Sequence, residues 1–114
     1  MPYISTKVTT KITPEQELIL RDKYAKSITL LPGKSNAHLM LCFEENCRLH
    51  FAGENNFPIA FVEVSLLGKS TKEGYAALTS QICSDICEVF GRDDFVTYVK
   101  YCETETWGMN GTNF

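Results

Sequence analysis

The stretch Pro58-Ile-Ala-Phe-Val-Glu-Val-Ser-Leu-Leu67 decides the fold. It is a mostly apolar run closed by Gly68, which is typical of a strand buried in a sheet. A helix is predicted over residues 71–90, where apolar side chains recur three or four positions apart and Gly91 supplies the stop. A further strand is predicted over 95–102. This part of the chain therefore predicts a strand–helix–strand unit.

The region before this stretch begins with the same two elements. Residues 2–9 are rich in β-branched side chains and predict a strand. Thr13-Pro14-Glu15-Gln16 combines a capping threonine, a proline suited to the first helical position and a glutamine that completes a capping box. The apolar helical spacing continues to Leu31, and Pro32-Gly33 ends the predicted helix.

A mostly apolar run over 37–43 predicts the strand that completes this first unit. The polar stretch 44–56 predicts a loop with a short edge strand at 49–51. The predicted strand, helix and strand of residues 1–57 recur in the same order about 57 positions later, in residues 58–114. We therefore expect one α/β domain over 1–114 (α+β in some schemes), in which two βαβ pseudo-repeats form a four-stranded mixed sheet with both helices on one face.

Two helices can cover only one face of such a sheet. The strand over 58–67 nevertheless places apolar side chains on both of its faces, with Ile59 and Phe61 alternating with Val62 and Val64. The second face therefore needs a partner, and we expect a homo-oligomer.

Composition excludes several classes of protein. The 114 residues carry 11 Lys and Arg against 14 Asp and Glu, a net charge of −3 without a basic run, which argues against nucleic-acid binding and against adhesion to an anionic membrane. No apolar stretch approaches the ~20 residues that cross a bilayer, and the N-terminus does not resemble a signal peptide. We expect a cytoplasmic protein whose five cysteines are reduced thiols.

No metal or cofactor site is expected. Cys83 and Cys87 lie four positions apart on the predicted second helix, where packing in the core is favoured over the alternative of metal ligation. Cys42 and Cys47 are not accompanied by a second pair of Cys or His residues at the spacing of a zinc site. The segment 68–71 resembles the end of a phosphate loop but lacks the upstream glycine.

The dipeptide Met1-Pro2 is the most informative feature of the N-terminus. The initiator methionine is removed when the next side chain is small, so the mature chain is expected to begin at Pro2. A terminal proline carries a secondary amine, and Pro2 opens directly into the predicted strand. The sheet would therefore fix the position of that nitrogen, although a terminal proline alone is often functionally silent.

Several motifs occur in a fixed order along the whole chain. They are Met1-Pro2, Pro32-Gly33-Lys34 followed by His38-Leu-Met-Leu, Phe51-Ala-Gly53, Pro58 and Ala60, Val62-Glu-Val64, Leu67-Gly68, Thr97-Tyr-Val-Lys-Tyr101 and the tail Trp107-Gly-Met-Asn-Gly-Thr-Asn-Phe114. With these motifs the chain resembles the macrophage migration inhibitory factor family of the tautomerase superfamily. The resemblance implies a homotrimer with its sheets facing inward and its site between subunits.

The resemblance also implies a catalytic site. Pro2 would be the general base for keto–enol tautomerisation of small aromatic α-keto acids, with Lys34 on the substrate carboxylate. The backbone of Leu67 would contribute to binding, and Tyr98 and Lys100 would reach in from the neighbouring subunit. Further residues are expected to line the pocket: Tyr3, His38, Ser65, Trp107 and Met109.

Some residues depart from the family pattern. Lys100 stands where the best-known members carry Asn, and Met109 where they carry Trp or Phe, so Trp107 is expected to supply the aromatic wall. Isomerase activity is the leading hypothesis. The alternative is a cytokine-like or host-directed signalling ligand with vestigial activity, which would imply a receptor protein as partner and non-classical secretion.

Overall fold

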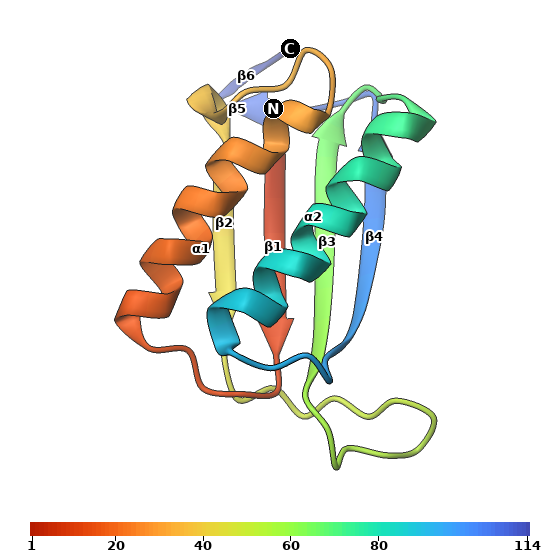
Figure 1. Ribbon diagram of the computed structural model, residues 1–114. Helices are drawn as coiled ribbons and strands as arrows, with labels where there is room; N and C mark the ends of the chain where they lie inside the picture. Colours follow the sequence, from red (N-terminus) through yellow and green to blue (C-terminus); the bar gives the residue numbers. More distant parts are fainter.

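The main sheet has four strands in the order β2-β1-β3-β4, and a two-stranded hairpin lies beside it (Figure 1). The computed structural model describes all residues, 1–114. Its elements are β1 (Pro2–Val8), α1 (Pro14–Ser27), the short 3-10 helices η1 (Ile28–Leu30) and η2 (Asn36–His38), β2 (Met40–Glu44), β3 (Ile59–Leu67), α2 (Lys72–Phe90), β4 (Val96–Thr104), β5 (Gly108–Met109) and β6 (Thr112–Asn113). Neither α-helix combines the length and apolarity that a membrane span requires.

The pairing of the strands confirms the predicted fold class. β1 pairs in parallel with β2, and β3 in parallel with β4, so each helix connects two parallel strands. The central strands β1 and β3 run antiparallel and join the two units into one mixed sheet. Both helices lie on the same face of that sheet (Figure 1).

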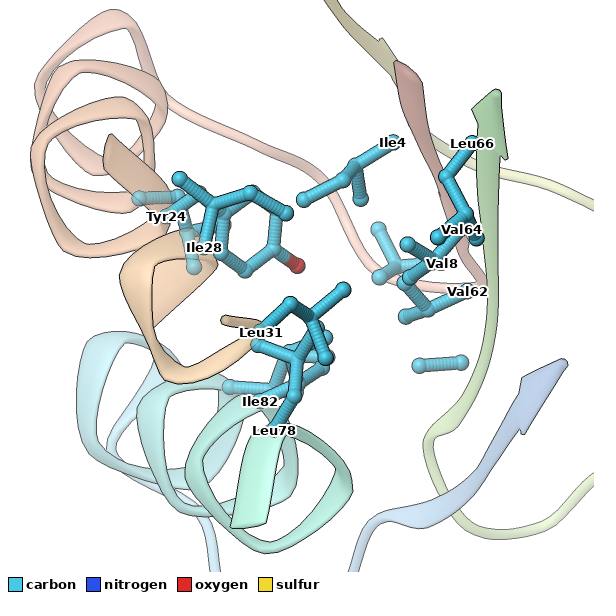
Figure 2. Packing of buried hydrophobic residues seen from close by; sticks show 13 residues of the cluster. Ile4, Val8, Tyr24, Ile28, Leu31, Val62, Val64, Leu66, Leu78 and Ile82 are labelled. Atoms are coloured by element: carbon cyan, nitrogen blue, oxygen red, sulfur yellow. The ribbon is translucent and has the colours of Figure 1, made fainter. Parts of the chain in front are cut away.

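The core lies between the helices and the sheet, as Figure 2 shows. Alternate residues of β1 and β3 point toward the helices, and α1 contributes Leu20 and Tyr24 to the same cluster. The Tyr24 hydroxyl shares a hydrogen bond of 2.9 Å with the Thr6 hydroxyl, so the only polar atom of this ring has a partner inside the core.

The predicted helix starts and stops are largely confirmed. Thr13 accepts a hydrogen bond from the backbone of Gln16, whose side chain accepts one from the Thr13 backbone. Gly91 ends α2 with a left-handed φ of 64°. The end of α1 differs, because regular helix stops at Ser27; the buried Ile28 begins η1, and the buried Leu31 follows it as the cap. The last turn tightens into 3-10 geometry before Pro32, which has no N–H to donate.

Two predicted strand positions were wrong. The strand expected over 37–43 begins only at Met40, because Ser35 caps η2 by accepting a hydrogen bond from Ala37 N. The edge strand expected at 49–51 does not form. Phe51 instead pairs with Glu54 in an isolated bridge closed by a turn in which Gly53 has a φ of 78°.

The face of the sheet away from the helices is mixed rather than apolar. Phe61 lies on this face, but its neighbours Ser5, Lys7, Glu63 and Lys100 share it, as the strand registers require. The apolar residues of β3 therefore do not make this face as apolar as the sequence of β3 alone suggests.

Candidate active site

A tight turn places Lys34 at the end of the sheet where β1 begins. The Lys34 N–H donates to the Leu31 carbonyl at 3.0 Å, with Pro32 and Gly33 between them. Gly33 has a φ of 79°, as the third residue of a type II turn requires, and proline suits the second position. The turn packs against the first turn of α2 at Gly74, where an added Cβ would lie 3.1 Å from the Leu30 carbonyl oxygen.

Lys34, Leu67 and the N-terminus meet at one point. The Lys34 ammonium Nζ donates to the carbonyl oxygen of Leu67 at 2.9 Å, and Leu67 N donates to the Met1 carbonyl oxygen at 3.3 Å. Pro2 is buried and paired with Leu66 in the register of β1 and β3. Three of the expected site residues, Pro2, Lys34 and Leu67, are thus brought together by the pairing of the two central strands.

This junction favours a neutral amine. Burial lowers the pKa of the α-amino group of Met1, and the nearby positive charge of Lys34 lowers it further. Both causes act against the protonated form, the first by removing water from a charge and the second by repulsion. An amine at this end of β1 is therefore more easily neutral at physiological pH than an ordinary α-amino group.

A cavity of about 1010 Å³ opens beside the N-terminus. Six of the residues expected at the site line it: Pro2, Tyr3, His38, Ser65, Trp107 and Met109. The last two come from the hairpin of β5 and β6, whose two-residue turn at Asn110 and Gly111 has φ angles of 50° and 91°. These positive values fit a type I′ turn, which brings the end of the chain back over the cavity.

The end of β4 adds cavity residues that the sequence reasoning missed. Cys102, Glu103 and Thr104 line the cavity, and Glu103 accepts a hydrogen bond from the Tyr75 hydroxyl on α2. The predicted strand ended at 102, whereas β4 continues to Thr104 opposite Leu67. The alternation of Val99, Tyr101 and Glu103 on the helix-facing side is the signal that would have extended the strand.

Tyr98 and Lys100 lie away from this cavity within one chain. They pair with Phe61 and Glu63, and along β4 they are roughly 13 and 7 Å from Cys102, the nearest residue of that strand that lines the cavity. Tyr98 is 62% exposed and its ring contacts Phe51 edge-on. The prediction that these two residues serve a neighbouring subunit's site stays a prediction.

The cysteines are all free, and no group of three or more His, Cys, Asp or Glu side chains is placed to hold a metal ion. Cys83 and Cys87 are half-buried and lie outside the main core cluster, where they had been expected to pack. Burial raises the pKa of the Cys83 thiol, and the neighbouring Cys87 raises it further. The thiol form of Cys83 is thereby favoured, which suits packing better than ligation.

Comparison of the whole fold with solved structures gives consistent neighbours. MIF2 of Leishmania major superposes with a TM-score of 0.88 and 27% identity, covering 100% of this chain and 97% of that one. The macrophage migration inhibitory factor of Toxoplasma gondii gives a TM-score of 0.79 at 19% identity, over 98% and 99% of the two chains. Pt0534, solved after inactivation by 2-oxo-3-pentynoate, gives 0.76 at 19% identity, over 96% and 93%.

The chain has the fold of the macrophage migration inhibitory factor family. Its neighbours in this family span its full length, and the family lies within the tautomerase superfamily. The resemblance drawn from the sequence motifs is therefore confirmed. No protein-family model matches the sequence, and a search of curated proteins finds no match either.

Proposed function

We propose that the chain is a keto–enol tautomerase for small aromatic α-keto acids, with the nitrogen of Pro2 as general base after removal of Met1. The observation that carries this proposal is the junction of Lys34, Leu67 and the N-terminus, together with the cavity that Met1 and Pro2 line; Lys34 and Leu67 are not themselves among the lining residues. Tautomerisation moves one proton between carbon and oxygen, so it needs a base beside the carbon and a positive charge near the oxygens.

Removal of Met1 would make the nitrogen of Pro2 a secondary amine. Pro2 is buried at the start of β1, so desolvation of the kind that lowers the pKa of the Met1 amine would also act on the Pro2 nitrogen. A neutral amine at this point takes the proton from the carbon next to the ketone and leaves an enolate. The protonated amine then returns the proton to the enolate oxygen, which completes the tautomerisation.

Lys34 suits the carboxylate of such a substrate. Its ammonium carries three donors, and the Leu67 carbonyl uses only one of them in the structure. The remaining donors are free for a charge-assisted bond to the substrate carboxylate. The same positive charge stabilises the negative charge that develops on the enolate.

The walls of the cavity favour an aromatic group on the substrate. Tyr3, Trp107 and Met109 contribute apolar or aromatic surface around Pro2. Pt0534, a structural neighbour, was inactivated by 2-oxo-3-pentynoate, itself a 2-oxo acid, which supports this substrate class. In a homotrimer with its sheets inward, Tyr98 and Lys100 of a neighbouring chain would complete the site.

The direct test is turnover of phenylpyruvate by the wild-type protein and by Pro2→Gly. Glycine also permits removal of Met1, so the variant keeps a free terminal amine but loses the proline ring. We expect the rate to fall by about 100-fold, because without the ring the amine is no longer held in place beside the substrate, and a small misplacement of a catalytic group can cost this much. Pro14→Ala, at the exposed start of α1, is the control and should keep the wild-type rate.

Intact-mass measurement accompanies the assay, because an amide nitrogen cannot act as a base. Retention of Met1 in an active preparation, or an unchanged rate for Pro2→Gly, would overturn the role of Pro2.

A further inference from the structure

A second hollow lies at the opposite end of the sheet from the candidate active site. It has a volume of about 640 Å³ and is formed where β1 ends, by the loop between β2 and β3, and by the turn after α2. Figure 1 shows these three connections together at the end of the molecule away from both termini. Cavities of this size are typical of small-molecule sites.

Apart from the thiol of Cys47, the ionisable side chains that line this second hollow are all basic. Arg48, His50 and Arg92 line it, and no Asp or Glu does, although acidic residues outnumber basic ones in the whole chain. Arg92 is held by two hydrogen bonds to the Asp94 carboxylate, at 3.0 and 2.7 Å, which neutralise its charge. Arg48 and His50 form no ion pair. Arg48 therefore leaves an uncompensated positive charge beside the hollow.

Neutral donors complete the lining. The side chains of Asn55 and Asn56 are exposed and can each donate from an amide. The Thr10 hydroxyl oxygen is buried without a hydrogen-bond partner. Buried polar atoms without partners are uncommon, but this oxygen is closed off from the hollow and is not one of its donors.

The remaining wall offers apolar surface. Phe57 and Leu49 line the hollow, and the Phe57 ring is held edge-on by Phe51 with ring centroids 6.4 Å apart. We propose that this second hollow binds a small organic phosphate, with the phosphate on Arg48 and the neutral donors and the organic part against Phe57. Guanidinium groups bind phosphate through paired hydrogen bonds, and no carboxylate is among the residues that line the hollow.

The test is a two-dimensional ¹⁵N–¹H NMR titration of the whole protein with AMP, and in parallel with inorganic phosphate. AMP should shift the amide signals of residues 9–10, 47–50 and 55–57 and leave those around Pro2 unchanged. Inorganic phosphate should shift the same signals with a several-fold weaker affinity, because it lacks a group to contact Phe57. Equal affinities for AMP and for inorganic phosphate would contradict the proposed contact between the organic group and Phe57.

Arg48→Gln is the decisive variant, because Arg48 is exposed and its replacement should not disturb folding. Loss of one charged hydrogen-bonding group should raise the dissociation constant for AMP about ten-fold. Arg21→Gln removes an equally exposed arginine from α1, where it pairs with Asp22, and should leave the constant within about two-fold. Equal weakening in both variants, or no shifts at these residues at 10 mM AMP, would contradict the proposal.

Discussion

At the scale of single residues, Lys34 connects the candidate site to the fold. The turn from Leu31 fixes its backbone, and the hydrogen bond to the Leu67 carbonyl fixes its ammonium at 2.9 Å. One side chain thus lowers the pKa of the terminal amine and supplies the positive charge that a carboxylate would meet. Removing its charge should therefore change two measurable properties together.

Lys34→Gln should raise the KM for phenylpyruvate by about ten-fold or more, since a hydrogen bond to a charged group contributes about 1.5–3 kcal/mol. It should also move the rising limb of the pH–rate profile to higher pH, because one of the two causes that lower the amine pKa is gone. Steady-state kinetics across pH measure both effects. Lys69→Gln is the control, an exposed lysine just beyond β3. A changed KM without a shifted limb would show that Lys34 does not act on the base.

At the scale of elements, the helix caps were open to prediction because local chemistry determines them. The Thr13 capping box and the Gly91 stop involve neighbours in the sequence. The terminal hairpin was not predicted, because its strands are only two residues long and carry no periodicity. Its turn residues Asn110 and Gly111 were the available signal.

The candidate site was predictable in part for the same reason. The motifs around Pro2 and Lys34 could be read from the sequence, but the cavity residues Glu103 and Thr104 depend on how far β4 pairs with β3. The length of a strand depends on its partner strand, which a single segment does not reveal. The uneven polarity of the open sheet face likewise depends on β1 and β4 as much as on β3.

The packing of α1 on β1 gives a prediction for stability. Tyr24→Phe leaves the buried Thr6 hydroxyl without its partner and should lower the free energy of unfolding by about 1–2 kcal/mol in urea titrations. Thr6→Val should cost a similar amount. The double variant should cost clearly less than the two single costs combined, because both ends of the bond are then absent. Additive costs would show that the bond contributes nothing.

The same tyrosine predicts a loss of stability in alkali. Burial raises the pKa of Tyr24 well above its ordinary value, so the folded protein keeps the ring neutral where the unfolded chain ionises, near pH 10. The unfolded state then binds fewer protons, and stability falls as the pH rises above this value. The free energy of unfolding of the wild type should fall more between pH 8 and 10.5 than that of Tyr24→Phe. An equal loss in both would contradict this account.

At the scale of the whole molecule, the proposed site draws on residues of a neighbouring chain. Tyr98 and Lys100 do not line the cavity beside Pro2; they lie further along β4 on the sheet face that the helices leave open. A homotrimer would give a molar mass three times the 12.9 kDa of the chain, about 39 kDa, in light scattering coupled to size exclusion. A monomer at micromolar concentration would contradict the shared site and leave Tyr98 and Lys100 without a role in it.

The central claim is that a buried, neutral amine at Pro2 is the base. The most direct measurement is the pH dependence of kcat/KM for phenylpyruvate with protein whose loss of Met1 has been verified by mass. Because the base must be unprotonated, the rate should rise with pH and level off. The midpoint should lie below the 7.7–8.0 typical of α-amino groups. A midpoint at or above that range, or a rate that does not change with pH, would contradict the account.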